Sequence, residues 1–478
     1  MIPDDDTLLR STLALLDHIT PFRSVQGEIA QQRALAQWLE TWLARHTGAQ
    51  VVLPVAQQNL QTEPPLVHVR IDTGAAMTLV LYNMYDVMPA DDAGWEVPPF
   101  IGGIRRWPTL GDVYVSRGAE NNKGPLAGML TVVKALVDSG TVALNLEIIL
   151  EGEEETGSGY LRRYLAQLPC PIAPASAVLF PSLCEYGGGE PRLYLGFTGL
   201  SNGRLTVKGG EWGGPQAAIH ASNASWIANP AWRLVQALQA IAPANENGVL
   251  ETLTIDEEAA ALLETLATTF SIDDELRFRH SQRLRQDNGT LANLHALIGS
   301  SVLNISEIKT TPVGARGVIP PFAQAELAFR TPPGIDATRL INDVRTRLAQ
   351  PDLAGSVLTL DDSYPGYRFS RHAPGVKALL DSYRRHGAQP QIWPWAPGCA
   401  PASAFAPIAP AFLLGGLGHG GNAHGVNEFV TLQGLRRFQR SLLDWLSAFT
   451  ATSSSSLYTP CDSENMLPQT SGYPNEKY

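Results

Sequence analysis

At 478 residues the chain is long enough to bury a large core and to form two or more lobes. Its composition, with 44% hydrophobic and 17% charged residues, is that of an ordinary globular protein. The formal net charge of −11 and the lack of a basic run argue against nucleic acid and against a membrane surface as partners.

The start of the chain and its cysteines favour a cytoplasmic location. The opening stretch MIPDDDTLLRSTLALLDHI is acidic where a secretory signal would be basic. No apolar run approaches the roughly 18 residues that a membrane-spanning helix needs. The cysteines are widely spaced and form no metal-binding pair, so we expect free thiols; they are Cys170, Cys184, Cys399 and Cys461.

The first 150 residues predict an α/β layer. Apolar positions at helical spacing predict helices over 5–18 and 28–46. The apolar runs at 77–87 and 144–150 predict buried strands, and 124–140 predicts a helix that its glycine closes. Strand, helix and strand in this order favour a mainly parallel sheet, whose ligands bind beyond the carboxyl ends of the strands. Both acidic clusters of this part of the chain fall at such ends.

The pattern changes near residue 199 and returns near 367. Between them the sequence predicts a smaller α+β domain, with hairpin-linked strands and two helices on one face. The predicted order is strand, helix, strand, strand, helix, strand, over 200–210, 229–241, 301–310, 322–334, 336–350 and 356–362. Residues 245–300 read as a charged, partly helical insertion. From 375 the α/β pattern resumes, and from 451 the chain is polar, without a period, and predicted to be disordered.

The small domain is therefore predicted to be inserted into the large one. The large domain comprises 1–198 and 368–450, the inserted domain 199–367, and the tail 451–478. Hinges near 199 and 367 would let the two domains close on a ligand.

Six motifs stand out along this framework. Four are rich in polar groups: MYDVMPADDAGWEVPPF (84–100), SRGAENNKGP (116–125), EGEEETGSG (151–159) and GHGGNAHGVNE (418–428). The other two, HASNASWIANPAWRL (220–234) and GVIPPFAQAELAFRTPPG (317–334), lie in the inserted domain. In order and spacing the six resemble the clan of zinc-dependent exopeptidases and amidohydrolases that includes carboxypeptidase G, aminoacylase, carnosinase and succinyl-diaminopimelate desuccinylase. The resemblance runs from about residue 10 to 450.

The resemblance implies a zinc-exopeptidase-type catalytic domain with an inserted lid and dimerisation domain, and hence a homodimer. It also implies two zinc ions bridged by a carboxylate, with a glutamate as general base. Amide hydrolysis at neutral pH needs such an activated water and a stabiliser for the oxyanion.

One of the two implied metal positions is largely present. By the resemblance, Glu155 and His424 match its ligands, and Glu154 matches the general base. Asp86 matches the aspartate that orients a histidine ligand of the other position. In the inserted domain, His220 and Arg330 match groups that meet the substrate carbonyl and carboxylate, with Asn304 assisting them. A guanidinium suits a carboxylate because it binds it through two parallel hydrogen bonds.

The other implied position has lost its ligands. Met84 stands where a histidine is implied, and Asn121 stands for the bridging aspartate. A neutral thioether is a poor ligand for Zn²⁺. At an effective dielectric constant of about 20, two dications about 3.5 Å apart repel by roughly 19 kcal/mol, which a neutral amide offsets far less than a carboxylate. The third ligand position holds Pro181 or Ser182, although a shifted alignment would bring in Glu185.

Each of these residues also has a purely structural interpretation. Met84 could fill a gap in the core, and Asn121 could cap a helix from a turn. The Glu154–Glu155 pair could be a solvated loop, Arg330 a surface residue of a strand, and His220 an unrelated residue, because the segment after it departs from the family pattern.

Three functions remain open. The first, which we favour, is a hydrolase of a small carboxylate-bearing amide that uses one zinc, held by Glu155, His424 and the Asn121 carbonyl, beside Glu154 as base. The second is a metal-free enzyme in which Glu154 and His220 perform acid–base chemistry such as cyclisation, isomerisation or acyl transfer. The third is a non-catalytic relative that binds a peptide-like ligand or acts as a scaffold.

Overall fold

The structure, a computed structural model, describes residues 2–58, 61–243, 247–286 and 288–452 of the chain. The tail predicted to be disordered comprises 451–478, and its residues from 453 onward lie outside these ranges. Cys170, Cys184 and Cys399 carry free thiols, as expected, and Cys461 falls outside the described residues. In the described part of the chain, no helix has the length and apolar character needed to cross a membrane.

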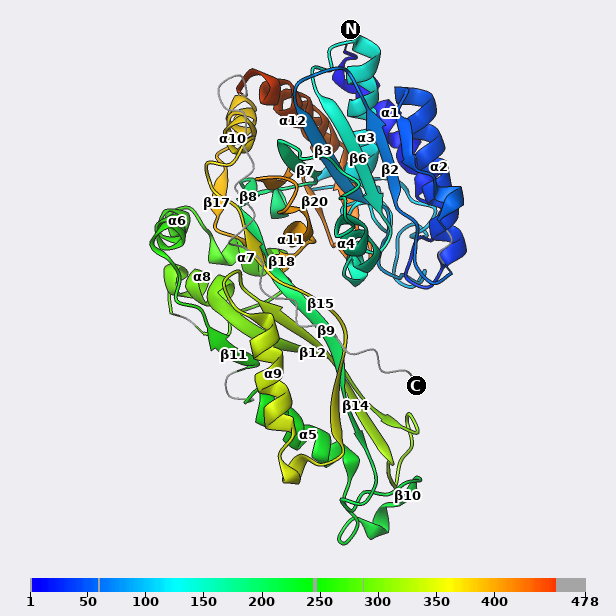
Figure 1. The fold of residues 1–478 in the computed structure, drawn as a ribbon, viewed down its shortest axis with the longest axis vertical. Helices are drawn as coiled ribbons and strands as arrows, with labels where there is room; N and C mark the ends of the chain where they lie inside the picture. Colours follow the sequence, from blue (N-terminus) through cyan, green and yellow to red (C-terminus); the bar gives the residue numbers. More distant parts are fainter. Residues whose placement is uncertain (1, 59–60, 244–246, 287, 453–478) are drawn as a thin grey trace.

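A six-stranded sheet forms the centre of the first lobe, at the top of Figure 1, in the order β1-β2-β6-β3-β7-β19. The strands β6, β3, β7 and β19 run parallel, whereas β1 and β2 are antiparallel additions at one edge. This confirms the predicted mainly parallel sheet. The strands are β1 Gln50–Leu53, β2 Val67–Ile71, β3 Thr78–Met84, β6 Asn145–Glu151, β7 Ala177–Pro181 and β19 Phe412–Gly415.

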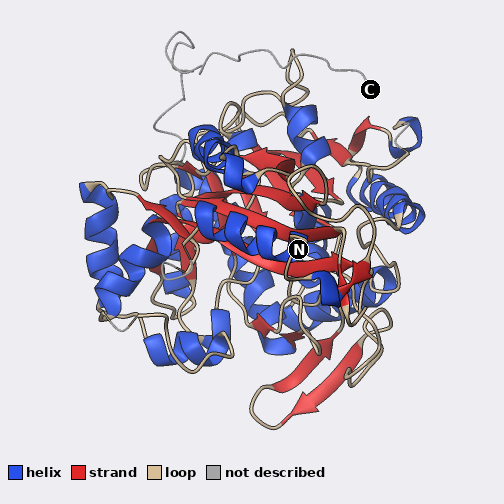
Figure 2. Ribbon diagram, turned by 90° about the horizontal axis from the view of Figure 1, so that it is seen from below, coloured by secondary structure: helices blue, strands red, loops and turns tan. Residues whose placement is uncertain are grey.

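Helices cover both faces of this sheet (Figure 2). Successive side chains of a strand point to opposite faces, so Leu79 and Leu81 of β3 pack with α1, α2, α3 and α12, while Val80 and Tyr82 pack with α4 and α11 on the other side. The continuous apolar runs seen in the sequence follow from burial on both faces. The helices are α1 Asp5–Ile19, α2 Ile29–Thr47, α3 Lys123–Ser139, α4 Gly159–Leu165, α10 Val376–Arg385, α11 Ala402–Phe405 and α12 Leu432–Thr452.

The helices predicted before the sheet and between its strands are confirmed within one or two residues as α1, α2 and α3. The helix α3 ends as predicted at a glycine. Gly140 has a φ of 67°, a left-handed conformation that lets its N–H bond back to the carbonyls of Leu136 and Val137.

A four-stranded sheet beside the large one joins two distant parts of the chain, in the order β20-β21-β5-β4. Because β21 pairs with β5, the loop after β5 lies next to the turn between β20 and β21. These two segments contain the second and fourth polar motifs of the sequence. The strands are β4 Gly103–Trp107, β5 Gly111–Val115, β20 Gly420–Gly421 and β21 Phe429–Thr431.

The second lobe is built on a seven-stranded sheet whose main path is β11-β12-β14-β9-β15, with β16 and β18 also paired to β9. Two helices, α5 and α9, pack on it with a core of their own. Every strand and helix predicted for this region is present. These are β9 Gly196–Lys208, α5 Pro230–Ile241, β12 Ser300–Thr311, β14 Phe322–Thr331, α9 Ala337–Leu348 and β15 Ser356–Tyr364. Three strands that were not predicted join them: β11 Val249–Thr252, β16 Tyr367–Arg368 and β18 Ala396–Cys399.

The charged insertion is helical, as predicted, and its helices lie where the two lobes meet (Figure 1). The helices α6 and α8 contact each other, α6 contacts β17, and α8 contacts β18. The strand β17 pairs with β8 of the first lobe. These elements are α6 Glu257–Ala267, α7 Ile272–Phe278, α8 Thr290–Gly299, β8 Arg192–Tyr194 and β17 Gln391–Trp393.

Candidate active site

Two acidic clusters lie at the same edge of the six-stranded sheet. The parallel strands β3 and β6 are in register, with Met84 opposite Glu151, so their carboxyl ends coincide. The chain after β3 brings Asp86 to this edge, and the chain after β6 forms the short helix Glu154–Thr156. The backbone N–H of Glu155 donates to Asp86 Oδ2 at 3.0 Å, which ties the two clusters together. The strand order read from the sequence thus predicted where the carboxylates meet.

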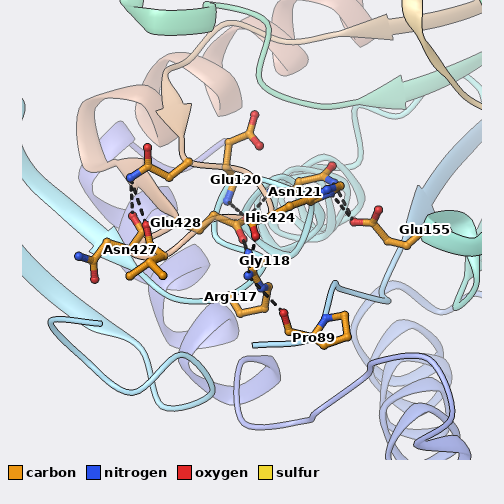
Figure 3. A network of polar contacts seen from close by, with 11 residues as sticks. Pro89, Arg117, Gly118, Glu120, Asn121, Glu155, His424, Asn427 and Glu428 are labelled. Carbon is orange, nitrogen blue, oxygen red and sulfur yellow. Dashed lines mark hydrogen bonds and ion pairs between the residues drawn. The ribbon is translucent and has the colours of Figure 1, made fainter. Parts of the chain in front are cut away.

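Three side chains from three segments converge at this edge (Figure 3). The distance between His424 Nε2 and Glu155 Oε1 is 3.0 Å. The Asn121 amide nitrogen lies 2.9 Å from the same Glu155 oxygen and 3.0 Å from the same His424 nitrogen. The hydrogen bond to Glu155 raises the pKa of His424. The structure therefore brings together the three residues predicted to hold one metal ion.

With Glu155 ionised, no placement of protons satisfies all three contacts of this trio. If the Asn121 amide donates to both partners, the 3.0 Å contact between Nε2 and Oε1 has no proton. If Nε2 carries a proton, it faces the amide N–H₂ group. A half-turn of the Asn121 amide exchanges its nitrogen and oxygen. With His424 Nε2 unprotonated, lone pairs of the amide oxygen, of Glu155 Oε1 and of Nε2 then point at one another. A single divalent cation satisfies all three, so the trio fits one metal ion.

The residues at the first implied metal position do not fit a second ion. Met84, 1% exposed, lies in the apolar cluster that also holds Phe180 and Phe405. Amides fill the rest of the position, because Asn122 donates to the Pro181 carbonyl at 3.4 Å and accepts from the Ser182 hydroxyl at 3.1 Å. In the described ranges, no group of three or more histidine, cysteine, aspartate or glutamate side chains is placed to hold a metal.

Asp86 is left without the partner that its implied role requires. Its Oδ1 atom is buried and accepts no hydrogen bond from the residues that the structure describes. Burial and the charge of Glu155 raise the pKa of Asp86 to about 8. An aspartate that orients a histidine has lost that histidine here, since Met84 stands in its place.

The alternative that Glu185 restores a carboxylate ligand is not supported by its contacts. Glu185 accepts from the Gly418 N–H at 2.7 Å and from Arg437 Nε at 3.1 Å. Its carboxylate is thus committed to Arg437 of α12.

Glu154 carries a carboxylate that no hydrogen bond or ion pair engages within the described residues. Burial and the negative charge of Glu155 raise its pKa well above the ordinary value. A cation bound to Glu155 would remove much of that repulsion and favour the carboxylate form. Glu154 is thus placed to exchange a proton beside the trio.

The predicted substrate-binding residues of the second lobe are placed differently from one another. Arg330, in β14, donates to Cys399 Sγ at 3.1 Å and borders a cavity of about 810 Å³. Asn304, in β12, is exposed two residues from Val302, which lies opposite Arg330, so the two side chains share one face of the sheet. His220 is not brought to this site. It is exposed in β10 (Ile219–His220), at the far end of the second lobe (Figure 1), and its Nδ1 accepts from the Ser222 N–H at 3.1 Å.

Sequence reasoning missed a buried carboxylate that organises the site. Glu428, fully buried, accepts from Arg117 Nη1 at 2.6 Å and from the backbone N–H groups of Gly118, Glu120 and Asn121 at 2.8 to 3.0 Å (Figure 3). Arg117 in turn donates to the His424 carbonyl at 3.0 Å. Glu428 therefore sets the positions of two members of the trio. The sequence did contain a sign of this residue, because Glu428 is the last residue of the HGVNE motif.

Glu428→Ala is expected to destabilise the protein by about 3–5 kcal/mol. The substitution leaves the buried Arg117 guanidinium without its anion and three N–H groups without an acceptor. Urea unfolding measures the loss. The free energy of unfolding of Glu428→Gln, which keeps an acceptor but no charge, should lie between those of the wild type and of Glu428→Ala. A variant within 1 kcal/mol of the wild type would contradict the role assigned to Glu428.

His419, which directly precedes β20, gives the stability of the protein a testable pH dependence. Burial lowers the pKa of His419 below the 6.5 of a free histidine. The unfolded chain then takes up a proton at a pH where folded His419 stays neutral, so the free energy of unfolding falls as the pH drops below 6.5. His419→Gln should flatten this acid-side decrease in urea unfolding measured in steps from about pH 7 to about pH 5.

The exposed His372 provides the control, because His372→Gln should keep the wild-type pH profile. If His419→Gln loses stability on acidification as steeply as the wild type does, the burial of His419 contributes nothing to the profile.

Comparison with known proteins adds a family and a fold. The family model described as peptidase family M20/M25/M40 matches residues 80–448. A Cys-Gly metallodipeptidase of Candida albicans is 26% identical over 298 residues, which are 60% of this chain and 59% of that protein. A cysteinylglycine-S-conjugate dipeptidase of Corynebacterium striatum is 26% identical over 160 residues, 33% of this chain and 32% of that one. The matches thus span between a third and three fifths of these two relatives.

Solved structures show the same fold over almost the whole chain. An M20 family metallo-carboxypeptidase from Sulfolobus solfataricus superposes with a TM-score of 0.80 at 23% identity, covering 92% of this chain and 99% of that chain. Human carnosine dipeptidase 1 superposes with a TM-score of 0.72 at 16% identity, covering 94% and 98%. The architecture with a parallel-sheet lobe and an inserted lobe is therefore shared with these two proteins.

Proposed function

The chain belongs to peptidase family M20/M25/M40, and from this premise we propose that it hydrolyses the amide bond of a small carboxylate-bearing substrate, a dipeptide or an N-acyl amino acid, with one zinc ion. The observation that carries the proposal is the trio of Glu155, His424 and Asn121 beside the unengaged carboxylate of Glu154. The curated relatives are dipeptidases, which supports a small peptide as the substrate class.

In this proposal Glu155, His424 and the Asn121 carbonyl hold the ion. Zinc at such a site supplies Lewis-acid polarisation of a carbonyl and lowers the pKa of water. The residues of the chain do the rest. Glu154 accepts the proton of the attacking water and passes it to the leaving amine, a transfer that calls for a carboxylate within hydrogen-bond reach and free of other partners. Arg330 binds the substrate carboxylate with a guanidinium whose one hydrogen-bond partner among the described residues is the Cys399 thiol.

The experiment is a zinc determination on protein purified without chelators, joined to an amidase assay on dipeptides and N-acyl amino acids. The proposal expects about one zinc per chain and turnover that chelators abolish and zinc restores. Turnover that survives complete removal of metal would instead favour acid–base chemistry by Glu154 without an ion. A protein with no metal and no turnover that still binds a small acid would be a non-catalytic relative.

We also propose that the protein is a homodimer with its contact in the second lobe. At the far end of that lobe Trp226 is 78% and Trp232 is 69% exposed, a pair of large apolar surfaces that association would cover. His220 lies in the same region and would then face the partner chain. Light scattering should give twice the chain mass of 51.6 kDa; the mass of a single chain would contradict this proposal.

A further inference from the structure

A cavity of about 810 Å³ is lined by residues of both lobes. Arg330 and Cys399 border it on one side, and residues of α7, α8 and β17 form much of its wall. Cavities of this size hold ligands considerably larger than the smallest dipeptides. Burial raises the pKa of the Cys399 thiol to about 11, and the nearby charge of Glu154 adds to the effect. Cys399 therefore contributes a neutral thiol to the wall of the cavity.

Aromatic rings line the far wall of the cavity. Arg192 is 5.2 Å from the ring centre of Tyr186, 5.2 Å from that of Trp393 and 5.6 Å from that of Phe270. Its charge is balanced by an ion pair with Glu275. Leu294 and Leu297 of α8 add apolar surface. The wall thus offers flat, apolar faces whose nearest charge is already paired, which suits an aromatic group.

The same wall contains two N–H groups without acceptors. Trp393, 1% exposed, has a buried Nε1–H that makes no hydrogen bond, and the Nδ2 atom of Asn293 is also buried and unpaired. A buried donor without a partner costs about 1–3 kcal/mol. Both atoms are closed off from the cavity by the packing around them, so they place no polar requirement on a ligand.

We propose that this cavity binds the side chain of the amino acid whose carboxylate contacts Arg330, and that it selects a large aromatic side chain. The assignment of the carboxylate to Arg330 rests on the proposed function. Because Arg330 borders the cavity, a side chain next to a carboxylate held by Arg330 would enter the cavity, and under the proposed function the amide would face Glu154. The substrate class is then an N-acyl or aminoacyl derivative of an aromatic amino acid.

The test measures binding of two amide-free probes by calorimetry. The first, 2-(4-hydroxybenzyl)-4-oxopentanoate, copies N-acetyltyrosine with CH₂ in place of NH. The second, 2-methyl-4-oxopentanoate, copies N-acetylalanine in the same way. The aromatic probe is expected to bind at least about tenfold more tightly, because it buries a ring that the other lacks.

Two matched variants locate the binding. Leu297 and Leu291 are both exposed on α8, but only Leu297 lines this cavity. Leu297→Trp should reduce the preference for the aromatic probe to less than about threefold while leaving the methyl probe within about twofold of its wild-type affinity. Leu291→Trp should keep both affinities.

Equal affinities for the two probes, no measurable binding of either, or a preference that survives Leu297→Trp would overturn this inference. The probes contain no scissile amide, so the outcome does not depend on turnover. A protein that prefers the aromatic probe but never hydrolyses N-acetyltyrosine would refute the proposed hydrolase and leave the cavity assignment standing. Equal hydrolysis of N-acetyltyrosine and N-acetylalanine, with equal probe affinities, would support the proposed hydrolase and refute the cavity assignment.

Discussion

Glu154→Gln is expected to lower kcat/KM for amide hydrolysis by about 10³-fold while KM changes little. Glutamine has the shape of glutamate but cannot accept a proton, and a positioned general base contributes about 10² to 10⁴ to the rate. Because the Glu154 carboxylate has no hydrogen bond or ion pair among the described residues, the substitution leaves no partner unsatisfied. The loss should therefore appear in kcat and leave the free energy of unfolding nearly unchanged.

The neighbouring Glu153→Gln is the matched control. The Glu153 carboxylate accepts the backbone N–H of Tyr160 at the start of α4, a contact that the glutamine oxygen can also make. This variant should keep kcat/KM within about twofold of the wild type. A Glu154→Gln enzyme that retains more than about a tenth of wild-type kcat/KM would exclude Glu154 as the general base.

His424→Ala is expected to reduce bound zinc from about one ion per chain to less than about 0.1, and to abolish chelator-sensitive hydrolysis with it. The trio offers one imidazole, one carboxylate and one amide, so removal of the imidazole leaves a single strong ligand. Metal analysis after dialysis against micromolar zinc measures the content. The assay on the same sample shows whether activity follows the metal.

Two further variants make this prediction specific. His419→Gln changes a histidine five positions away that faces the Glu185 carbonyl, 3.2 Å from its Nδ1, and should keep its zinc. Met84→His with Asn121→Asp restores two of the three implied ligands of the first metal position, and the unpaired Oδ1 of Asp86 can accept from the new imidazole. This double variant should bind about two zinc ions per chain. If it gains none, Met84 and Asn121 do not mark a lost metal position.

The sequence predicted those parts of the fold that depend on local pattern. The spacing of apolar residues located α1, α2 and α5, and Gly140 marked the end of α3, because these signals lie within a few residues of one another. The order of strands placed Asp86 and Glu155 at one edge of the sheet, since parallel strands share their carboxyl ends. Periodicity and strand order are enough for such features.

Contacts between distant residues could not be predicted in this way. Glu185 lies close in sequence to the missing ligand, but its ion pair with Arg437 joins residues 252 positions apart. Glu428 reaches Arg117 across 311 positions. The position of His220 far from the site depends on how far the second lobe extends. A local sequence pattern does not predict that distance. In each case the deciding contact is set by packing that only the complete fold brings about.

The single strand β9 has a consequence for which substrates the protein can use. Its residues Phe197 and Thr198 pair with β16 and β18, while Gly199 and Leu200 already pair with β14, where Leu200 lies opposite Arg330. At Gly199 a Cβ atom would come within 2.3 Å of the Gly366 nitrogen, so the backbone of β9 and the backbone at Gly366 are in direct contact there. Arg330 is therefore held on a strand that is paired on both sides, with β12 and with β9, and not on a loose tether. Under the function proposed above, the substrate carboxylate would be held at a point fixed by paired backbone, and a substrate extended beyond that carboxylate would lose this contact.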